Sequence, residues 1–381
     1  MYAPYGQLGR LVRNEEENEK MSEKLRVGIL GGTGMVGQRF ISLLENHPWF
    51  EVVTIAASAR SAGKTYEEAV GGRWKMATPM PEAVKKIVVM NVNEVEKVAA
   101  GVDFVFSAVD MSKEEIKAIE EEYAKTETPV VSNNSAHRWT PDVPMVVPEI
   151  NPEHFEVIES QKKRLGTTRG FIAVKPNCSI QSYAPVLTAW KEFEPYEVVA
   201  TTYQAISGAG KNFKDWPEMV ENIIPYIGGE EEKSEQEPLR IWGTVQNGEI
   251  VKAQEPKITC QCIRVPVLNG HTAAVFVKFR KQPTKEELID RLVNFRGFPQ
   301  EAGLPSAPKQ FIRYMEEDNR PQVQLDVDYE NGMGISVGRL REDSIYDWKF
   351  VGLSHNTVRG AAGGAVLCAE TLKAKGYITK K

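Results

Sequence analysis

Long apolar runs and basic blocks are both missing from this sequence. No stretch approaches the roughly 18 consecutive apolar residues that a membrane-spanning helix needs, and no Lys/Arg-rich block accompanies the net charge of −5. Because binding to nucleic-acid phosphates requires clustered positive charge, we expect neither a membrane nor a nucleic acid among the partners.

Cysteine is scarce as well. The four cysteines, Cys178, Cys260, Cys262 and Cys368, are too few and too scattered for a disulfide framework, and no Cys-x-x-Cys pair indicates a zinc site. We therefore expect a reducing, cytoplasmic environment and no metal.

A targeting segment is the third feature that is missing. Residues 1–21 hold no apolar core of the kind that a signal peptide needs, and residues 14–19 are too acidic for a transit peptide. We predict that residues 1–21 form a flexible extension, either an alternative start or a short docking arm.

The remaining composition is that of an ordinary globular protein, and 381 residues suggest two domains. Apolar segments at 25–30 and 51–57 flank a glycine-rich turn and a segment of helical periodicity at 38–44. Further strands are predicted at 87–90, 102–108 and 129–132, and a helix at 113–124. This alternation predicts an α/β fold with a doubly wound, Rossmann-type domain over residues 22–155.

The pattern changes after Pro144, Pro148 and Pro152. The later part predicts strands at 198–204, 259–267 and 271–279, with 273–279 buried on both faces, and helices at 217–227 and 285–294. We expect an α+β domain over residues 156–356. The small residues of 357–375 predict a C-terminal helix that packs back on the first domain and completes it.

The glycine-rich turn at residues 31–37 follows a predicted strand and opens a predicted helix. Gly31, Gly34 and Gly37 let the backbone turn sharply and approach a pyrophosphate at the helix N-terminus. The second strand ends without the acid that holds an NAD ribose. Ser58, Arg60 and Ser61, with Lys64 nearby in the sequence, suit a 2′-phosphate instead. These residues predict NADP binding; the alternatives are a tight turn without a ligand and a basic surface loop.

Cys178 follows an apolar segment and a Pro-Asn turn, and the run from Ser179 to Trp190 predicts a helix. A thiol at a helix N-terminus has a lowered pKa, which favours the nucleophilic thiolate. His271 follows a glycine that could aim its imidazole, and Arg264 lies in the same segment; they can move a proton and hold a carboxylate. Taken singly, each of the three has an inert structural role as its alternative.

These residues, taken together, resemble the aspartate-semialdehyde dehydrogenase family, in particular its archaeal/fungal branch. The resemblance rests on the glycines at 31–37, Pro176-Asn177-Cys178-Ser179, the Gln204 segment, Glu230-x-x-Lys233, and Arg264 seven residues before His271. The motifs occur in the family's order and span nearly the whole chain from about residue 25.

The resemblance implies a role for each matching residue. Cys178 would be the acyl-thioester nucleophile, His271 the general acid/base, and Gln204 would orient the reacting group. Arg264 would bind the substrate carboxylate and Glu230 its ammonium, while Lys233 and Asn177 would face phosphate. The acidic run leaves the register of Glu230 open, since Glu235 and Glu237 follow it and a solvated helix face is the alternative.

The resemblance also implies a set of cofactor-binding residues and an assembly. The residues expected to contact NADP are Gly31, Thr33, Gly34, Met35, Val36, Gly37, Ser58, Arg60, Ser61, Ser107, Ser207, Gly208 and Asn356. Residues 156–356 would then be a catalytic and dimerisation domain in a homodimer or homotetramer. The implied reaction is the reversible, NADP-dependent conversion of L-aspartate 4-semialdehyde and phosphate to L-aspartyl 4-phosphate, in lysine, threonine and methionine biosynthesis.

Three other functions are alternatives. An acyl-CoA reductase resembling malonyl-CoA reductase would keep the cysteine, histidine and arginine but accept a CoA thioester. An N-acetyl-glutamyl-phosphate reductase fits less well, since its acylated substrate has no free ammonium for Glu230. A non-catalytic NADP-binding sensor would not need all the reactive residues.

Overall fold

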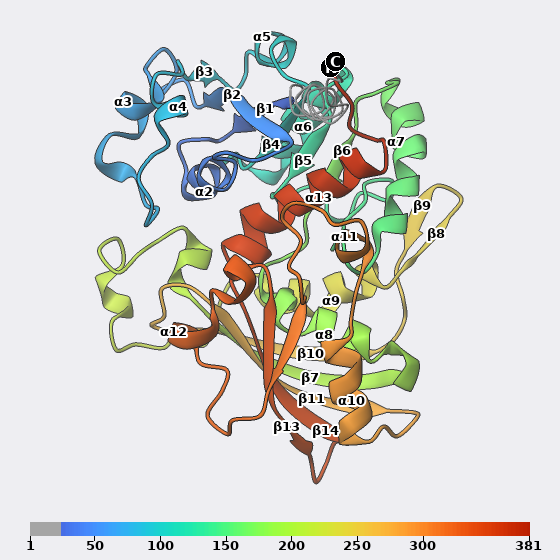
Figure 1. Cartoon of the computed structure of the whole chain (residues 1–381). Coiled ribbons are helices and arrows are strands. Elements are labelled where there is room, and N and C mark those ends of the chain that lie inside the picture. Colours follow the sequence, from blue (N-terminus) through green and yellow to red (C-terminus); the bar gives the residue numbers. More distant parts are fainter. Residues whose placement is uncertain (1–23) are drawn as a thin grey trace, which may run out of the picture.

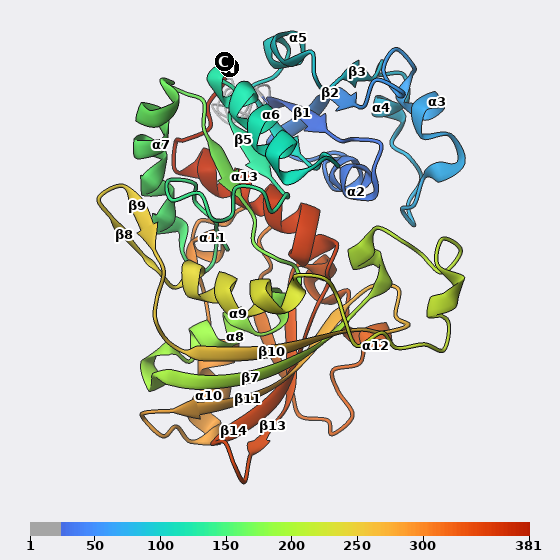
Figure 2. The same ribbon diagram turned by 180° about the vertical axis from the view of Figure 1, so that it is seen from behind.

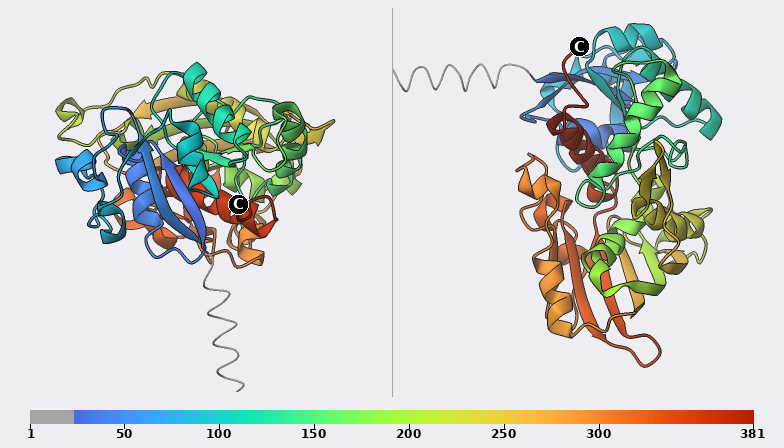
Figure 3. Two further views of the ribbon diagram at one scale, coloured as in Figure 1. Left: turned by 90° about the horizontal axis from the view of Figure 1, so that it is seen from above. Right: turned by 90° about the vertical axis from the view of Figure 1, so that its right-hand side faces the viewer.

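The computed structural model describes residues 24–381; the extension predicted at residues 1–21 lies outside the described residues. Two six-stranded sheets dominate the fold, one in each of two stacked halves (Figures 1 and 3). None of the helices in residues 24–381 combines the length and apolarity that a membrane span requires.

The first sheet is parallel throughout and has the strand order β3-β2-β1-β4-β5-β6. Its strands are β1 (Leu25–Leu30), β2 (Phe50–Ala57), β3 (Met90–Asn91), β4 (Phe104–Ser107), β5 (Val130–Ser132) and β6 (Ile172–Val174). This is the strand order of a doubly wound dinucleotide-binding fold, so the predicted fold class is confirmed. The boundary at residue 155 stays a prediction, and β6, which follows it, belongs to this sheet.

Within residues 24–381, seven α-helices accompany the first sheet. They are α2 (Met35–Leu43), α3 (Tyr66–Val70), α4 (Glu82–Lys85), α5 (Val95–Ala100), α6 (Lys113–Lys125), α7 (Ile158–Leu165) and α13 (Gly363–Ala374). Helix α13 follows a π-helical turn at Val358–Ala362 and buries Ala365, Val366 and Leu372 in the core of the first sheet. The C-terminal helix therefore packs on the first half (Figure 1).

The second sheet is mixed and has the order β10-β7-β11-β14-β13-β12. Its strands are β7 (Pro195–Gln204), β10 (Lys257–Arg264), β11 (His271–Phe279), β12 (Ile312–Met315), β13 (Ile335–Glu342) and β14 (Trp348–Ser354). A hairpin, β8 (Thr244–Gln246) and β9 (Glu249–Val251), also lies in this half. Among the residues that the structure describes, its α-helices are α8 (Ala184–Ala189), α9 (Glu230–Ile241), α10 (Lys285–Val293), α11 (Phe298–Glu301) and α12 (Val323–Asp326).

One face of the second sheet forms the core of this half. Alternate residues of β7, β10 and β11 are buried with residues of α8 and α10. Helix α9 lies between this sheet and the first half (Figures 1 and 2). The residues of β11 between the buried ones are half-buried in the single chain, so burial of 273–279 on both faces stays a prediction.

Three predicted elements away from Cys178 differ from the structure. The helix at 217–227 is a 3₁₀ turn at Pro217–Met219, because Glu221 has a φ of 57° and Pro225 lacks the N–H that a helix needs. The strand at 87–90 reduces to β3, with Val88 in an isolated bridge to Thr65. The strand at 259–267 ends at Arg264, before Pro266, which cannot donate to a ladder.

Candidate active site

A cavity of about 290 Å³ opens where the two halves meet. The start of α2 and the loops that follow β5, β6 and β14 line it, together with η5 (Ile206–Ala209) and α9. Of the predicted site residues it brings together Met35, Val36, Asn177, Cys178, Ser207, Gly208, Glu230, Lys233 and Asn356.

The glycine-rich turn is shaped to receive an anion at this cavity. Gly31 has a φ of +81°, and a Cβ there would lie 2.2 Å from the carbonyl oxygen of Ala108. A Cβ on Gly37 would lie 2.3 Å from the carbonyl oxygen of Gly31, so α2 packs closely on the turn. Gly34 caps α2 without a side chain, which leaves the N–H groups of the first turn available to a phosphate. The residues present therefore fit a dinucleotide.

The predicted 2′-phosphate residues lie at the end of β2, outside this cavity. Ser58 and Arg60 are exposed, and Ser61 is buried in a turn that its N–H closes on the Ser58 carbonyl at 2.9 Å. Ser107, at the end of β4, accepts a hydrogen bond from Nδ2 of Asn134 at 3.1 Å.

Cys178 follows β6 and is partly exposed to the cavity. Its Sγ lies 3.4 Å from Nε2 of His271. Gly360 packs closely against Cys178, because a Cβ on Gly360 would lie 2.7 Å from the Cβ of Cys178. This contact restricts the position of the cysteine. A nucleophile and a proton-bearing imidazole thus face each other at the cavity.

The predicted helix after Cys178 and the predicted lowered thiol pKa are both wrong. The run forms a 3₁₀ turn at Ser179–Ser182, breaks at Tyr183 and restarts as α8, so no long helix dipole points at the sulfur. Burial raises the pKa of the Cys178 thiol to about 11, and the charge of Glu230 adds to the rise, while Lys175 opposes it.

His271 begins β11 and is fully buried. Burial, aided by the charge of Arg264, lowers the pKa of His271 to about 3, so the ring is neutral at neutral pH. The backbone N–H of Ala205 donates to Nδ1 at 3.0 Å. A neutral ring whose Nδ1 accepts carries its proton on Nε2, and His271 therefore presents an N–H to the sulfur.

Helix α9 turns Glu230 and Lys233 toward Cys178. Nδ2 of Asn177 donates to both carboxylate oxygens of Glu230 at 3.1 and 2.9 Å, and Lys233 pairs with the same carboxylate at 2.8 Å. Burial alone would raise the pKa of Glu230, but Lys233 and Asn177 outweigh it and hold this pKa below its usual range. The Glu230 side chain is 12% exposed, so this acid is not on a solvated face.

Arg264 and Gln204 are buried just behind the cavity, at the paired ends of β10 and β7. Nη1 of Arg264 donates to the Ala205 carbonyl at 2.6 Å, and Nε2 of Gln204 donates to Thr202 at 3.2 Å. A Cβ on Gly208 would lie 3.1 Å from Nη1 of Arg264 and 3.2 Å from His271, so both side chains lie close to this glycine, which lines the cavity.

Asn356 joins the loop after β14 to the rest of the site. Its Nδ2 donates to Ser207 at 2.8 Å, and its Oδ1 accepts the Gly270 N–H at 2.8 Å.

The sequence interpretation missed the loop after β5. Asn133, Asn134, Ser135 and Arg138 line the cavity and add a cation to it. Their signal was a run of polar residues directly after a buried strand of a parallel sheet, where ligands bind. Gly210, Thr357, Gly360 and Ala361 also line the cavity and were missed.

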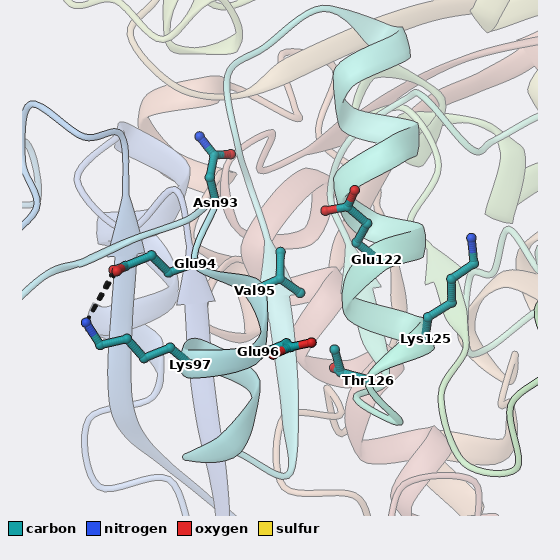
Figure 4. Close-up of a pocket in the computed structure, with 8 residues that line it drawn as sticks. All are labelled: Asn93, Glu94, Val95, Glu96, Lys97, Glu122, Lys125 and Thr126. Carbon is teal, nitrogen blue, oxygen red and sulfur yellow. Dashed lines mark hydrogen bonds and ion pairs between the residues drawn. The ribbon is translucent and has the colours of Figure 1, made fainter.

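A larger hollow of about 850 Å³ lies elsewhere, between α5 and α6 (Figure 4). Its lining is mostly charged side chains, two of which, Glu94 and Lys97, pair with each other, and neither a cysteine nor a histidine is among the lining residues. Within residues 24–381 no cluster of three His, Cys, Asp or Glu side chains could hold a metal. Cys178 therefore marks the better candidate site.

Comparison with known proteins gives one consistent family. The family models described as "Semialdehyde dehydrogenase, NAD binding domain" and "Semialdehyde dehydrogenase, dimerisation domain" match residues 26–158 and 185–359. Aspartate-semialdehyde dehydrogenase of Methanothermobacter thermautotrophicus is 43% identical over 356 residues, which cover 91% of this chain and 99% of the relative.

Two fungal comparisons agree. Aspartate-semialdehyde dehydrogenase of Candida albicans is 42% identical over 93% of this chain and 99% of the relative. A crystal structure of this Candida albicans enzyme with NADP superposes with a TM-score of 0.84 at 40% identity, covering 93% of this chain and all of that one.

Proposed function

The chain belongs to the aspartate-semialdehyde dehydrogenase family, and on this premise we propose that it converts L-aspartate 4-semialdehyde, NADP⁺ and phosphate into L-aspartyl 4-phosphate, NADPH and a proton. The reverse reaction would serve lysine, threonine and methionine biosynthesis. The observation that carries the proposal is the 3.4 Å contact between Cys178 Sγ and His271 Nε2 at a cavity that Asn177, Glu230 and Lys233 also line.

NADP is the cofactor that these residues suit. The turn at 31–37, including Thr33, Met35 and Val36, would hold the pyrophosphate, and Ser58, Arg60 and Ser61 would hold the 2′-phosphate. Ser107, Ser207, Gly208 and Asn356 would border the nicotinamide end. When bound, NADP⁺ accepts the hydride of the aldehyde carbon.

The covalent chemistry belongs to Cys178. Its thiolate attacks the aldehyde carbon to form a thiohemiacetal, loss of hydride leaves a thioester, and a phosphate oxygen then displaces the sulfur. The thiol's own proton leaves to water before the attack. Because Nδ1 of His271 accepts the Ala205 N–H, His271 donates a hydrogen bond from Nε2, first to the thiolate and then to the oxyanion of the thiohemiacetal, whose negative charge is released when hydride leaves.

Different polar residues would bind the semialdehyde and the phosphate. Arg264 would bind the α-carboxylate through two parallel hydrogen bonds, Glu230 the ammonium, and Gln204 would orient the aldehyde. Asn177 and Lys233 would face phosphate, and Arg138, unnoticed in the sequence, would join them because it lines the same cavity.

The assembly proposed is a homodimer or homotetramer in the cytoplasm. The matching dimerisation model covers the whole second sheet. The face of this sheet away from α8 and α10 carries Val199, Tyr203, Phe276 and Val351, which are half-buried or, for Tyr203, 38% exposed, and a second copy could cover them.

A comparison of two substrate pairs tests the reaction. NADPH formation is followed with L-aspartate semialdehyde plus phosphate, and separately with malonate semialdehyde plus CoA. We expect rapid, phosphate-dependent NADPH formation with the first pair and little with the second. CoA-dependent turnover with the second pair, and none with the first, would make the protein an acyl-CoA reductase.

A further inference from the structure

Glu237 is a buried acid on α9 that the proposed chemistry does not use. Its side chain has no exposed surface. One carboxylate oxygen accepts the backbone N–H of Asn177 at 2.5 Å, and the other accepts from Nη1 of Arg138 at 2.9 Å. A buried carboxylate costs free energy unless it is paired and hydrogen-bonded, and these two contacts supply that pairing.

The two partners of Glu237 come from different loops that meet at the cavity. Arg138 belongs to the loop after β5, and Asn177 to the loop after β6 and directly before Cys178. Arg138 also donates from Nε to the carbonyl of Lys175 at 3.0 Å. One carboxylate thus ties both loops to α9, at the side of the cavity where Asn177, Lys233 and Arg138 gather.

The spacing along α9 explains why this acid faces inward. Glu230, Lys233, Ser234 and Glu237 lie three or four residues apart and share one face of the helix. Glu231 and Glu235 instead accept the backbone N–H groups of Cys262 and Cys260 on β10, at 3.3 and 2.9 Å. Glu235 therefore makes the same kind of bond from the same helix, but away from the cavity.

We propose that Glu237 is a positioning residue for phosphate: it holds the Arg138 guanidinium and the Asn177 backbone in the places from which they face the attacking phosphate. The proposal rests on the proposed function. It assigns Glu237 to the second half of the reaction, in which phosphate displaces the thioester, and not to thioester formation.

The test compares Glu237→Gln with the matched control Glu235→Gln. A glutamine at 237 offers one oxygen and one NH₂ group, so it can satisfy Asn177 or Arg138 but not both. We expect the KM for phosphate to rise at least about 10-fold, with the KM for NADP and for the semialdehyde changed less than about 3-fold. Glu235→Gln should keep all three near wild-type values.

A second readout separates positioning from general structural support. Mixing enzyme, NADP and semialdehyde without phosphate should give a burst of NADPH from thioester formation. This burst should persist in Glu237→Gln while phosphate-dependent turnover falls. An unchanged KM for phosphate would overturn the proposal. A smaller burst together with equal rises in the KM for phosphate, NADP and the semialdehyde would overturn it as well.

Glu237→Asp keeps the test decisive if the glutamine variant does not fold. Aspartate retains the charge, but its side chain is one methylene shorter and cannot reach both partners. The phosphate KM should again rise selectively, and a wild-type value would refute the positioning role. If the wild-type enzyme itself forms no NADPH in a phosphate-dependent way, the proposed function fails, and this result is distinct from a failure of the Glu237 variants alone.

Discussion

At the scale of single residues, Cys178 and His271 are both neutral partners before substrate binds. With a thiol pKa of about 11, about one Cys178 in ten thousand is a thiolate at pH 7. The sulfur is nevertheless partly exposed, whereas Cys260, Cys262 and Cys368 are buried. Reactivity should therefore follow access first and ionisation second.

This contrast predicts the pH dependence of alkylation. Iodoacetamide should modify Cys178 faster than the other cysteines, with a rate that climbs about tenfold per pH unit from pH 7 towards about 11, because only the thiolate reacts. Bound semialdehyde should protect it. Peptide mass spectrometry follows the label, with Cys178→Ala as the control; a rate that levels off near pH 7 would contradict the raised pKa.

Arg264 gives a second prediction at this scale. Arg264→Leu should lower kcat/KM for the semialdehyde at least ~30-fold, because removing one partner of a buried charge pair costs about 2–5 kcal/mol. NADP binding, measured by fluorescence titration, should stay intact. Arg264→Lys keeps the charge but cannot make two parallel hydrogen bonds, so its kcat/KM should lie between those of the wild type and Arg264→Leu. Near-normal efficiency of Arg264→Leu would remove this residue from the site.

Sequence motifs predicted the nucleophile and its nearest partners, but not all of the residues that surround them. Cys178, His271, Glu230 and Lys233 stand in recognisable motifs, and the structure brings them together. Arg138 was missed, and Glu237 was named only as an alternative register for Glu230, because a charge in a loop or an acid-rich helix usually faces water. Their burial depends on contacts 99 residues apart in the chain, which local patterns do not encode.

At the scale of elements, the glycines of the turn at 31–37 serve two different purposes, close packing of the backbone and close approach of the ligand. Gly37 is needed for packing, since its added Cβ would meet backbone atoms of Gly31 and Gly32 at 2.3 and 2.6 Å. Gly34 has a φ of −78°, and its added Cβ would make only an ordinary contact at 3.5 Å. Gly34 is therefore not needed for packing, and we expect it to leave room for the pyrophosphate.

Two alanine variants should tell these roles apart. Gly37→Ala should destabilise the cofactor-free protein by about 1–3 kcal/mol, as overpacking does. Gly34→Ala should melt like wild type but bind NADP more weakly, because a methyl group would stand where the pyrophosphate approaches. Thermal melts and NADP titrations measure both. Equal melting of the two variants would contradict the packing argument.

Strongly periodic elements were predictable, and irregular ones were not. The helices predicted at 113–124 and 285–294 are found at 113–125 and 285–293, where Ser112 and Thr284 form capping boxes. The helix predicted after Cys178 was wrong because Pro185 is tolerated only in the first turn of a helix, so a new helix, α8, begins there. In the segment 217–227 a positive φ at Glu221 ended the periodicity that the apolar residues suggested.

At the scale of the whole molecule, the order of the first sheet was predictable from alternating strands and helices, whereas the mixed order of the second was not. Its pairings join segments as distant as β7 and β11, and both parallel and antiparallel neighbours occur. The sequence also left open which face of this sheet is covered. The structure shows one face packed against helices and the other half-buried.

The half-buried face leads to a prediction about assembly. Val199 lies opposite Phe276 across β7 and β11, and Thr259 flanks it on β10, so position 199 is surrounded by strands on this face. An obligate interface between copies excludes unpaired charge from its centre. Val199→Asp should therefore convert the oligomer to monomers of 42.6 kDa in sedimentation velocity, with an unchanged far-UV spectrum. Ile345→Asp adds the same charge at a position that is 77% exposed and lies between β13 and β14, and it should leave the oligomer intact. A buried aspartate in such an interface would have no partner to neutralise it. An oligomer that survives Val199→Asp would therefore place the subunit contact elsewhere, and a wild-type protein that sediments as a monomer would contradict the proposed assembly.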